Sequence, residues 1–231
     1  RRFRLHLGPA PLPYRAAVIL THPSPNFGER RDGARVQLVV LHYTAMPSCA
    51  AALERLCDPV AEVSAHYLID GDGSVLSLVD EAARAWHAGA GQWAGTGDVN
   101  SRSIGIELAN SGIDPFAEPQ MAALERLLAG VLDRHGLPPQ AVIGHSDLAP
   151  DRKGDPGARF DWRRLALQGL SVWPEPGEPG DFASDLRAFG YPEAAPDILL
   201  AAFRLRFRPW ARGPLDATDR ALAAGLRRFA G

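Results

Sequence analysis

Cysteine is scarce in this sequence: its 231 residues include only Cys49 and Cys57. Both fall in a segment with helical periodicity, where a separation of eight residues corresponds to about 12 Å along the helix axis. That distance is beyond the reach of a disulfide. The sequence therefore excludes a fold stapled by disulfides, and we expect two buried free thiols.

Long hydrophobic runs and an excess of one charge are also absent. The longest apolar stretches, such as residues 36–41, are far shorter than the ~20 residues that a membrane-spanning helix needs. The chain has 25 Lys and Arg against 27 Asp and Glu, so it lacks the excess of positive charge that is typical of nucleic-acid-binding proteins. Hydrophobic residues make up 46% and charged residues 23%, which is ordinary for a globular protein. We expect a monomer without a nucleic-acid partner or a nucleotide cofactor.

Lysine is almost missing. Of the 25 basic residues, 24 are arginine and one, Lys153, is lysine. Chance is one explanation. The other is that arginine cannot replace lysine at this position, because a compact ammonium and a planar guanidinium differ in size and in hydrogen-bonding geometry.

The spacing of the apolar residues predicts an α/β domain. Apolar and β-branched segments predict strands over residues 36–44, 65–69, 75–79, 103–109 and 141–144, with a hairpin turn between the second and the third. Helical spacing and end signals predict helices over residues 48–58, 119–135 and 161–168. A Gly-rich loop at 86–100 and a polar loop at 145–157 are expected between these elements.

The composition changes near residue 170. Residues 171–180 contain three Pro and two Gly, which is typical of a semi-rigid linker. Residues 181–231 show three helical patterns, at 182–189, 197–207 and 216–229, and no strand. We therefore predict an α/β domain over residues 1–170, with an irregular arm at 1–35, a linker over 171–180 and a helical domain over 181–231.

Residues that can bind a metal stand at the ends of predicted strands. His42 closes the most apolar strand, and His145 follows a buried strand and opens a polar loop with three aspartates. Glu107 lies inside an apolar strand, where a carboxylate is costly unless it has a partner or a task. Such a set suits a catalytic zinc site, which takes three N/O ligands and leaves a place for water. The spacing alone leaves this open, because the sequence has neither a His-Glu-x-x-His motif nor a CxxC pair.

Six segments appear in the order found in one family. They are residues 24–30 (SPNFGER), 41–45 (LHYTA), 63–67 (VSAHY), 86–89 (WHAG), 103–110 (SIGIELAN) and 144–157 (GHSDLAPDRKGDPG). Over about residues 20–170 the chain resembles the zinc-dependent N-acetylmuramoyl-L-alanine amidases of the amidase-2 type. The last segment, with Lys two residues before Asp-Pro-Gly, is the most specific. The resemblance implies a mixed central β-sheet flanked by helices, a fold shared with peptidoglycan recognition proteins.

The resemblance also implies the residues of the site. The implied zinc ligands are His42, His145 and Asp155. Glu107 is implied as the base that activates water, and Lys153 as the cation that stabilises the tetrahedral oxyanion. The single lysine of the chain thus falls on a catalytic position.

Four further residues lie in the matched segments. Tyr43 and Asn110 flank the implied site and are candidates for substrate binding, with packing of the scaffold as the alternative. His66 and His87 have no ligand role in the family, so we expect them beside the site, on the cleft wall or in the core.

The implied reaction is hydrolysis of the amide bond between N-acetylmuramic acid, or its anhydro form, and L-Ala of peptidoglycan stem peptides. It would serve cell-wall degradation or recycling. A non-catalytic peptidoglycan-binding protein is the alternative, and the complete set of five site residues favours the enzyme. The site chemistry is also compatible with a zinc hydrolase of another amide.

The C-terminal helices resemble, more weakly, a three-helix peptidoglycan-binding domain, with a packing appendage as the alternative. If this domain acts only in targeting, a chain ending near Trp173 would cleave small muropeptides at the full-length rate. A binding domain argues for a polymeric substrate, and hence for the periplasm or the inner face of the outer membrane. The cytoplasm is the alternative location.

Overall fold

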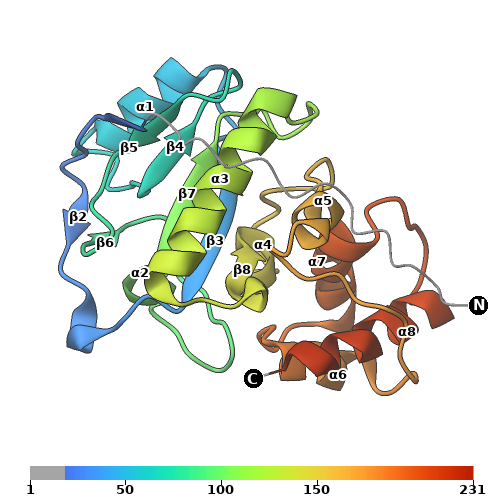
Figure 1. Cartoon of the computed structure of the whole chain (residues 1–231). Helices are drawn as coiled ribbons and strands as arrows, with labels where there is room; N and C mark the ends of the chain where they lie inside the picture. Colours follow the sequence, from blue (N-terminus) through green and yellow to red (C-terminus); the bar gives the residue numbers. More distant parts are fainter. Residues whose placement is uncertain (1–18, 231) are drawn as a thin grey trace, which may run out of the picture.

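A six-stranded mixed sheet forms the centre of the molecule (Figure 1). The computed structural model describes residues 19–230. Along the sheet the strands run β1 (Ile19–Thr21), β5 (Val75–Ser77), β4 (Tyr67–Ile69), β7 (Ser103–Leu108), β3 (Leu38–Tyr43) and β8 (Val142–Gly144). Within this sheet β4 and β5 pair antiparallel, and the other neighbours pair parallel. The predicted mixed α/β fold is confirmed.

The two central strands are buried on both faces. β3 and β7 are apolar along most of their length, as expected for parallel strands covered on both sides. Their register pairs His42 with Glu107. The parallel strand β8 ends one residue before His145. Because parallel strands end at the same edge of a sheet, His42, Glu107 and His145 arrive together at one edge.

One face of the sheet is covered by α3 (Glu118–His135). This helix has Pro119 in its first turn and ends at Gly136, which adopts a left-handed conformation with φ 62°. Its apolar side packs against Val39 and Leu41 of β3. Two shorter helices flank the sheet: α1 (Cys49–Cys57), capped by Ser48, and α5 (Trp162–Leu167), capped by Asp161.

The C-terminal helices cover the opposite face. They are α6 (Phe182–Phe189), α7 (Pro196–Phe207) and α8 (Ala217–Leu226), followed by the 3-10 turn η3 (Arg227–Phe229). Their apolar side chains form one cluster with Leu38 and Val40 of β3 and Ile143 of β8. Figure 1 shows these helices gathered beside β8. The residues of β3 therefore alternate between the two cores, as a strand with a helical layer on each side requires.

The Pro/Gly segment at residues 171–180 contains no helix or strand, but it lies against α8. The Gly177 N–H donates to the Ala221 carbonyl at 2.8 Å. A Cβ on Gly225 would stand 1.9 Å from the Glu175 carbonyl oxygen, so the chain passes where only glycine fits. The segment is thus packed along its path against the helices that follow it.

The structure corrects several details of the sequence analysis. The predicted arm lies partly outside the described residues, and its described part contains β1, β2 (Phe27–Gly28, paired with β6, Arg84–Ala85) and the turn η1 (Arg31–Gly33). The two predicted loops contain short helices, α2 (Val99–Arg102) and α4 (His145–Leu148), and η2 (Pro139–Ala141) precedes β8. Both cysteines are free, but they are half-buried. Within residues 19–230 no helix has the length and apolar character to cross a bilayer.

Candidate metal centre

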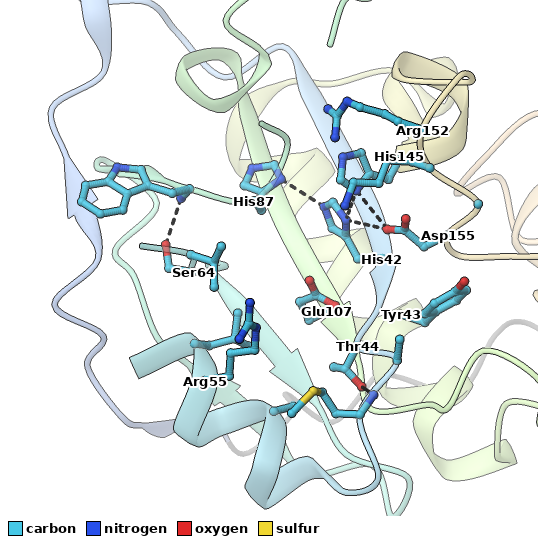
Figure 2. A pocket seen from close by; sticks show the side chains of 18 residues that line it. His42, Tyr43, Thr44, Arg55, Ser64, His87, Glu107, His145, Arg152 and Asp155 are labelled. Carbon is cyan, nitrogen blue, oxygen red and sulfur yellow. Dashed lines mark hydrogen bonds and ion pairs between the residues drawn. The ribbon is translucent and has the colours of Figure 1, made fainter. Parts of the chain in front are cut away.

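Three buried side chains converge at the edge where β3 and β8 end. His42 closes β3, His145 begins α4, and Asp155 lies in the loop that follows. His42 Nδ1 is 3.0 Å from His145 Nδ1 and 2.9 Å from Asp155 Oδ2, and His145 Nδ1 is 3.1 Å from the same oxygen (Figure 2). The Ser146 N–H donates to the Asp155 carbonyl at 2.9 Å, which ties the two ends of the loop together.

The hydrogen bonds of His145 fix its tautomer. Its Nε2 lies 3.0 Å from the carbonyl oxygen of Ala88. Because a carbonyl only accepts, Nε2 is the ring nitrogen that carries the proton in this contact. His145 Nδ1 therefore directs a lone pair at His42 and Asp155.

The tautomer of His42 follows from a longer chain of contacts. The Ser103 hydroxyl donates to the Val99 carbonyl at 2.6 Å, so its oxygen accepts from His87 Nε2 at 3.2 Å. His87 Nδ1 then accepts a proton from His42 Nε2 at 3.1 Å. Burial lowers the pKa of His42 to about 4, with a smaller effect of His145, so the ring is neutral at pH 7. His42 Nδ1 is consequently also a lone pair.

Three electron-pair donors thus face one another without a proton to share. They are His42 Nδ1, His145 Nδ1 and a carboxylate oxygen of Asp155. Such an arrangement is repulsive unless a cation lies between the atoms. Two imidazoles and a carboxylate, each secured by outer hydrogen bonds, are the donor set of a catalytic zinc site, so the residues present fit a zinc ion.

Glu107 lies beside this triad on the neighbouring strand. Its Oε2 is buried and has no hydrogen-bond partner among the described residues. Burial, followed by the negative charge of Asp155, raises the pKa of Glu107 to about 8. A buried carboxyl group with an unused oxygen and a pKa near neutrality is suited to accept and return a proton.

The triad and Glu107 lie in the wall of a cavity of about 390 Å³. Three cationic side chains, Arg55, Arg152 and Lys153, also line this cavity. Figure 2 shows Arg55 and Arg152 on different sides of the metal-capable group. The cavity therefore combines a buried donor set with a cationic border.

Arg152 and Lys153 are adjacent but differ in what they contact. The Arg152 guanidinium donates to the Ala88 carbonyl at 2.8 Å and also to the Ala90 carbonyl, and so fastens the loop over the site. The Lys153 side chain is exposed, lines the cavity and opposes the upward shift in the pKa of Glu107. The single lysine of the chain is therefore placed beside the metal-capable group.

The two residues predicted to bind substrate have different positions. Tyr43 lines the cavity and packs between Gly112 and Gly157, where an added Cβ would stand 2.9 and 3.1 Å from its ring. Asn110 does not line this cavity. Its amide donates to the Asp114 carbonyl at 3.2 Å and accepts from the Gly112 N–H at 2.8 Å. Both ends of the Asn110 amide thus bond within its own loop.

His66 and His87 also differ in what they contact. His66 accepts from the Gly105 N–H at 2.9 Å and lies 3.2 Å from the Ala83 carbonyl, so both ring nitrogens serve the scaffold. His87 contacts a predicted ligand, a role that the sequence analysis left open. The glycine at position 105 is the feature of the sequence that reflects this placement of His87, because an added Cβ there would stand 2.4 Å from the His87 ring.

Comparisons with known proteins point to one family. Residues 32–158 match the family Amidase_2, described as N-acetylmuramoyl-L-alanine amidase. The chain is 35% identical to N-acetylmuramoyl-L-alanine amidase AmiD of Escherichia coli over 231 residues, which covers 83% of this chain and 82% of AmiD. It is also 35% identical to the 1,6-anhydro-N-acetylmuramyl-L-alanine amidase AmpD of Escherichia coli over 162 residues, or 63% of this chain and 88% of AmpD.

Solved structures show the same fold. The complex of Escherichia coli AmiD with anhydro-N-acetylmuramic acid-L-Ala-D-γ-Glu-L-Lys superposes with a TM-score of 0.76 at 33% identity, covering 88% of this chain and 97% of that one. AmpDh3 of Pseudomonas aeruginosa gives a TM-score of 0.76 at 31% identity and covers 96% of this chain and 98% of that one. The similarity thus includes the C-terminal helices as well as the sheet.

Proposed function

The chain belongs to the Amidase_2 family of N-acetylmuramoyl-L-alanine amidases, and from this premise we propose the reaction and the metal. The protein hydrolyses the amide bond between N-acetylmuramic acid, or its anhydro form, and L-Ala of peptidoglycan stem peptides, with one zinc ion per chain. The observation that carries the proposal is the group of three lone pairs on His42, His145 and Asp155 beside the unpartnered carboxyl of Glu107.

His42, His145 and Asp155 would hold the zinc ion. When bound, zinc lowers the pKa of water and polarises the carbonyl that is attacked. A cation at the triad would also favour the ionised form of the neighbouring Glu107, and so oppose the effect of burial, which raises the pKa of this group. Glu107 is then a carboxylate ready to act as a base.

Two side chains of the protein, Glu107 and Lys153, would carry out the proton transfers and stabilise the developing charge. Glu107 accepts a proton from the attacking water while the water oxygen bonds to the amide carbon. Lys153, which lines the cavity, stabilises the negative charge that develops on the carbonyl oxygen. Glu107 then returns its proton to the amide nitrogen as the C–N bond breaks, which yields a carboxylic acid and the free amino group of L-Ala.

The cavity border suits an acidic substrate. Muropeptide stems carry carboxylates, and Arg55, Arg152 and Lys153 line the cavity. The AmiD structure contains an anhydromuropeptide, and the AmpD relatives are named for the anhydro sugar. Anhydromuropeptides are therefore the first substrates to test.

The zinc assignment is tested with His42→Ala. The control is His22→Ala, at an exposed histidine that does not line the cavity. Wild type and His22→Ala should each contain one zinc per chain and should split anhydro-N-acetylmuramic acid-L-Ala-D-γ-Glu-L-Lys. Mass spectrometry would detect the released tripeptide. His42→Ala should lack both zinc and activity, because it removes one of three protein donors. Stoichiometric zinc in His42→Ala would contradict the assignment, and a zinc-loaded wild type that binds but does not cleave would favour the recognition protein.

We also propose the periplasm or the inner face of the outer membrane as the location. The proposal depends on peptidoglycan binding by residues 181–231, which stays a prediction from sequence. Fractionation of the native host with an antibody against this chain would test the location, and pull-down with sacculi would test the binding.

A further inference from the structure

Arg206, near the end of α7, is a charged side chain buried in the core. It is 2% exposed and reaches from the C-terminal helices into the part of the chain that carries the candidate metal ligands. Its guanidinium donates to Asp147 Oδ2 at 2.6 Å, to the Val142 carbonyl at 3.0 Å and to the Ser171 hydroxyl at 3.3 Å. Arg206 therefore links α7 to β8 and to the turn that follows β8.

Asp147 receives this contact two residues after His145, in the same short helix α4. It is fully buried, and the same Oδ2 accepts from the Gly144 N–H at 2.8 Å. Its other oxygen accepts from the Tyr191 hydroxyl, which also belongs to the C-terminal part of the chain. Each carboxylate oxygen of Asp147 thus accepts a hydrogen bond from a residue beyond position 190.

The guanidinium also packs on the first residue of α5, the helix that follows the loop with Asp155. Its carbon lies 4.3 Å from the ring centroid of Trp162. An added Cβ on Gly144 would stand 3.3 Å from the Trp162 ring and 2.9 Å from Pro156, which follows Asp155 directly. A chain of contacts therefore runs from Arg206 through Trp162 to Gly144 and Pro156. Gly144 directly precedes His145, and Pro156 directly follows Asp155.

We propose that Arg206 is a positioning residue for the metal centre, and that the C-terminal helices are through it a structural part of that centre. The inference rests on the zinc role proposed above for His145 and Asp155. A buried carboxylate such as Asp147 is costly without its partner, so α4 keeps its geometry only while Arg206 is in place. Groups that orient metal ligands from outside typically change metal affinity or activity by ~10–100-fold when removed.

The chain supplies a matched control on the same helix. Arg204 is 8% exposed and pairs with the fully buried Asp219 at 2.5 Å. It also donates to the carbonyls of Gly213 at 2.6 Å and Pro214 at 2.9 Å. Arg204 thus makes comparable bonds, but all of them stay within the C-terminal part of the chain, with α8 and with the loop between α7 and α8.

The test compares Arg206→Met with Arg204→Met in the full chain. Zinc affinity is measured by competition with a chelator, at a temperature at which circular dichroism shows each variant to be folded. Both substitutions should lower the melting temperature, because both break a buried pair. Arg206→Met should weaken zinc binding at least ~10-fold, whereas Arg204→Met should stay within about twofold of wild type.

Two milder variants keep the test informative if Arg206→Met does not fold. Tyr191→Phe removes one hydrogen bond to Asp147, and Arg206→Lys keeps the charge but loses the planar fork. Both should weaken zinc binding relative to wild type, but by less than Arg206→Met does. If Arg206→Met is insoluble, the expected result is a severalfold loss of zinc affinity relative to wild type in each of the two milder variants. The absorption spectrum of the cobalt-substituted protein should change in these variants and not in Arg204→Met.

The possible results separate the two proposals. Wild-type zinc affinity and an unchanged cobalt spectrum in all variants at Arg206 and Tyr191 would overturn the positioning role. Equal weakening by Arg204→Met would overturn it as well, since that result indicates general loss of stability. A wild-type chain that binds no zinc would instead overturn the proposed function.

Discussion

At the residue scale, the direction of each hydrogen bond decides what the site can bind. The Ala88 carbonyl fixes the proton of His145, and the contacts through His87 and Ser103 fix that of His42. Both imidazoles consequently turn an unprotonated nitrogen toward Asp155. The tautomers, and not merely the proximity of the three side chains, make this group suited to hold a cation.

The single lysine gives a prediction at this scale. Lys153→Arg should keep the fold and the zinc but lose at least ~10-fold in kcat, because the planar guanidinium cannot place one compact charge at the oxyanion. Turnover of an anhydromuropeptide, with zinc content measured in parallel, checks this. The exposed Arg159, in the same loop but outside the cavity lining, provides the control Arg159→Lys, which should keep the wild-type rate. A wild-type rate in Lys153→Arg would show that lysine is there by chance.

At the element scale, a cluster around Glu81 joins the loop after β5 to the end of α3. Arg134 and His135 of α3 donate to the Glu81 carboxylate at 2.6 and 2.8 Å, and the Tyr67 hydroxyl of β4 donates at 2.7 Å. Burial by itself would raise the pKa of Glu81, but these hydrogen bonds lower it to about 2. The ionised carboxylate is therefore more stable in the folded protein than in the unfolded chain.

This shift predicts how stability depends on pH. A depressed folded-state pKa stabilises the protein above the ordinary glutamate pKa, and the contribution is lost as the pH falls from about 4.5 to about 2. Glu81→Gln should lower the free energy of unfolding at pH 7 by at most about 3 kcal/mol, and the difference from wild type should shrink across that acidic range. Urea unfolding at pH 7, 4 and 2.5 measures this. Glu178→Gln, at a site with no side-chain bond among the described residues, is the control. A difference that does not depend on pH would contradict the assigned role of Glu81.

At the scale of the whole molecule, the C-terminal helices complete the second core. The buried faces of α6, α7 and α8 share an apolar cluster with Leu38, Val40 and Ile143 of the sheet. The Gly-rich loop at residues 86–100 contacts the same helices. The Ala94 N–H donates to the Gly190 carbonyl at 2.8 Å, and Trp93 packs on Phe189. A role of residues 181–231 in substrate targeting is compatible with this packing, and from the packing we expect that these residues also stabilise the sheet.

Truncation after Trp173 tests this packing and revises the expectation drawn from the sequence. Each large apolar side chain that becomes exposed costs ~1.5–3 kcal/mol, and a whole domain has only ~5–15 kcal/mol of stability. The shortened chain should therefore be insoluble or melt at least ~10 °C below the full chain, and it should lose turnover of small muropeptides as well as of sacculi. Soluble yield, melting temperature and both assays measure this. Full stability and full turnover of small muropeptides would show that the helices serve targeting alone.

The sequence by itself determined the main strands and helices, and its motifs singled out the three candidate metal ligands. Strands, helices and caps such as Ser48 and Asp161 depend on contacts between near neighbours, which periodicity and end signals report. The segments around His42, His145 and Asp155 carry enough specific positions to be matched to a family. The solitary Lys153 could be singled out by counting alone.

Only the tertiary structure decided how these residues are held. His87 and His42 are separated by 45 positions, and Arg206 and Asp147 by 59, so no local pattern predicts their contacts. The same applies to Asn110, whose motif is compatible with substrate binding and with scaffold packing, and whose amide bonds within its own loop. Packing likewise settled which face of β3 meets the C-terminal helices, because the alternate residues of its apolar part, residues 38–41, are equally suited to either core.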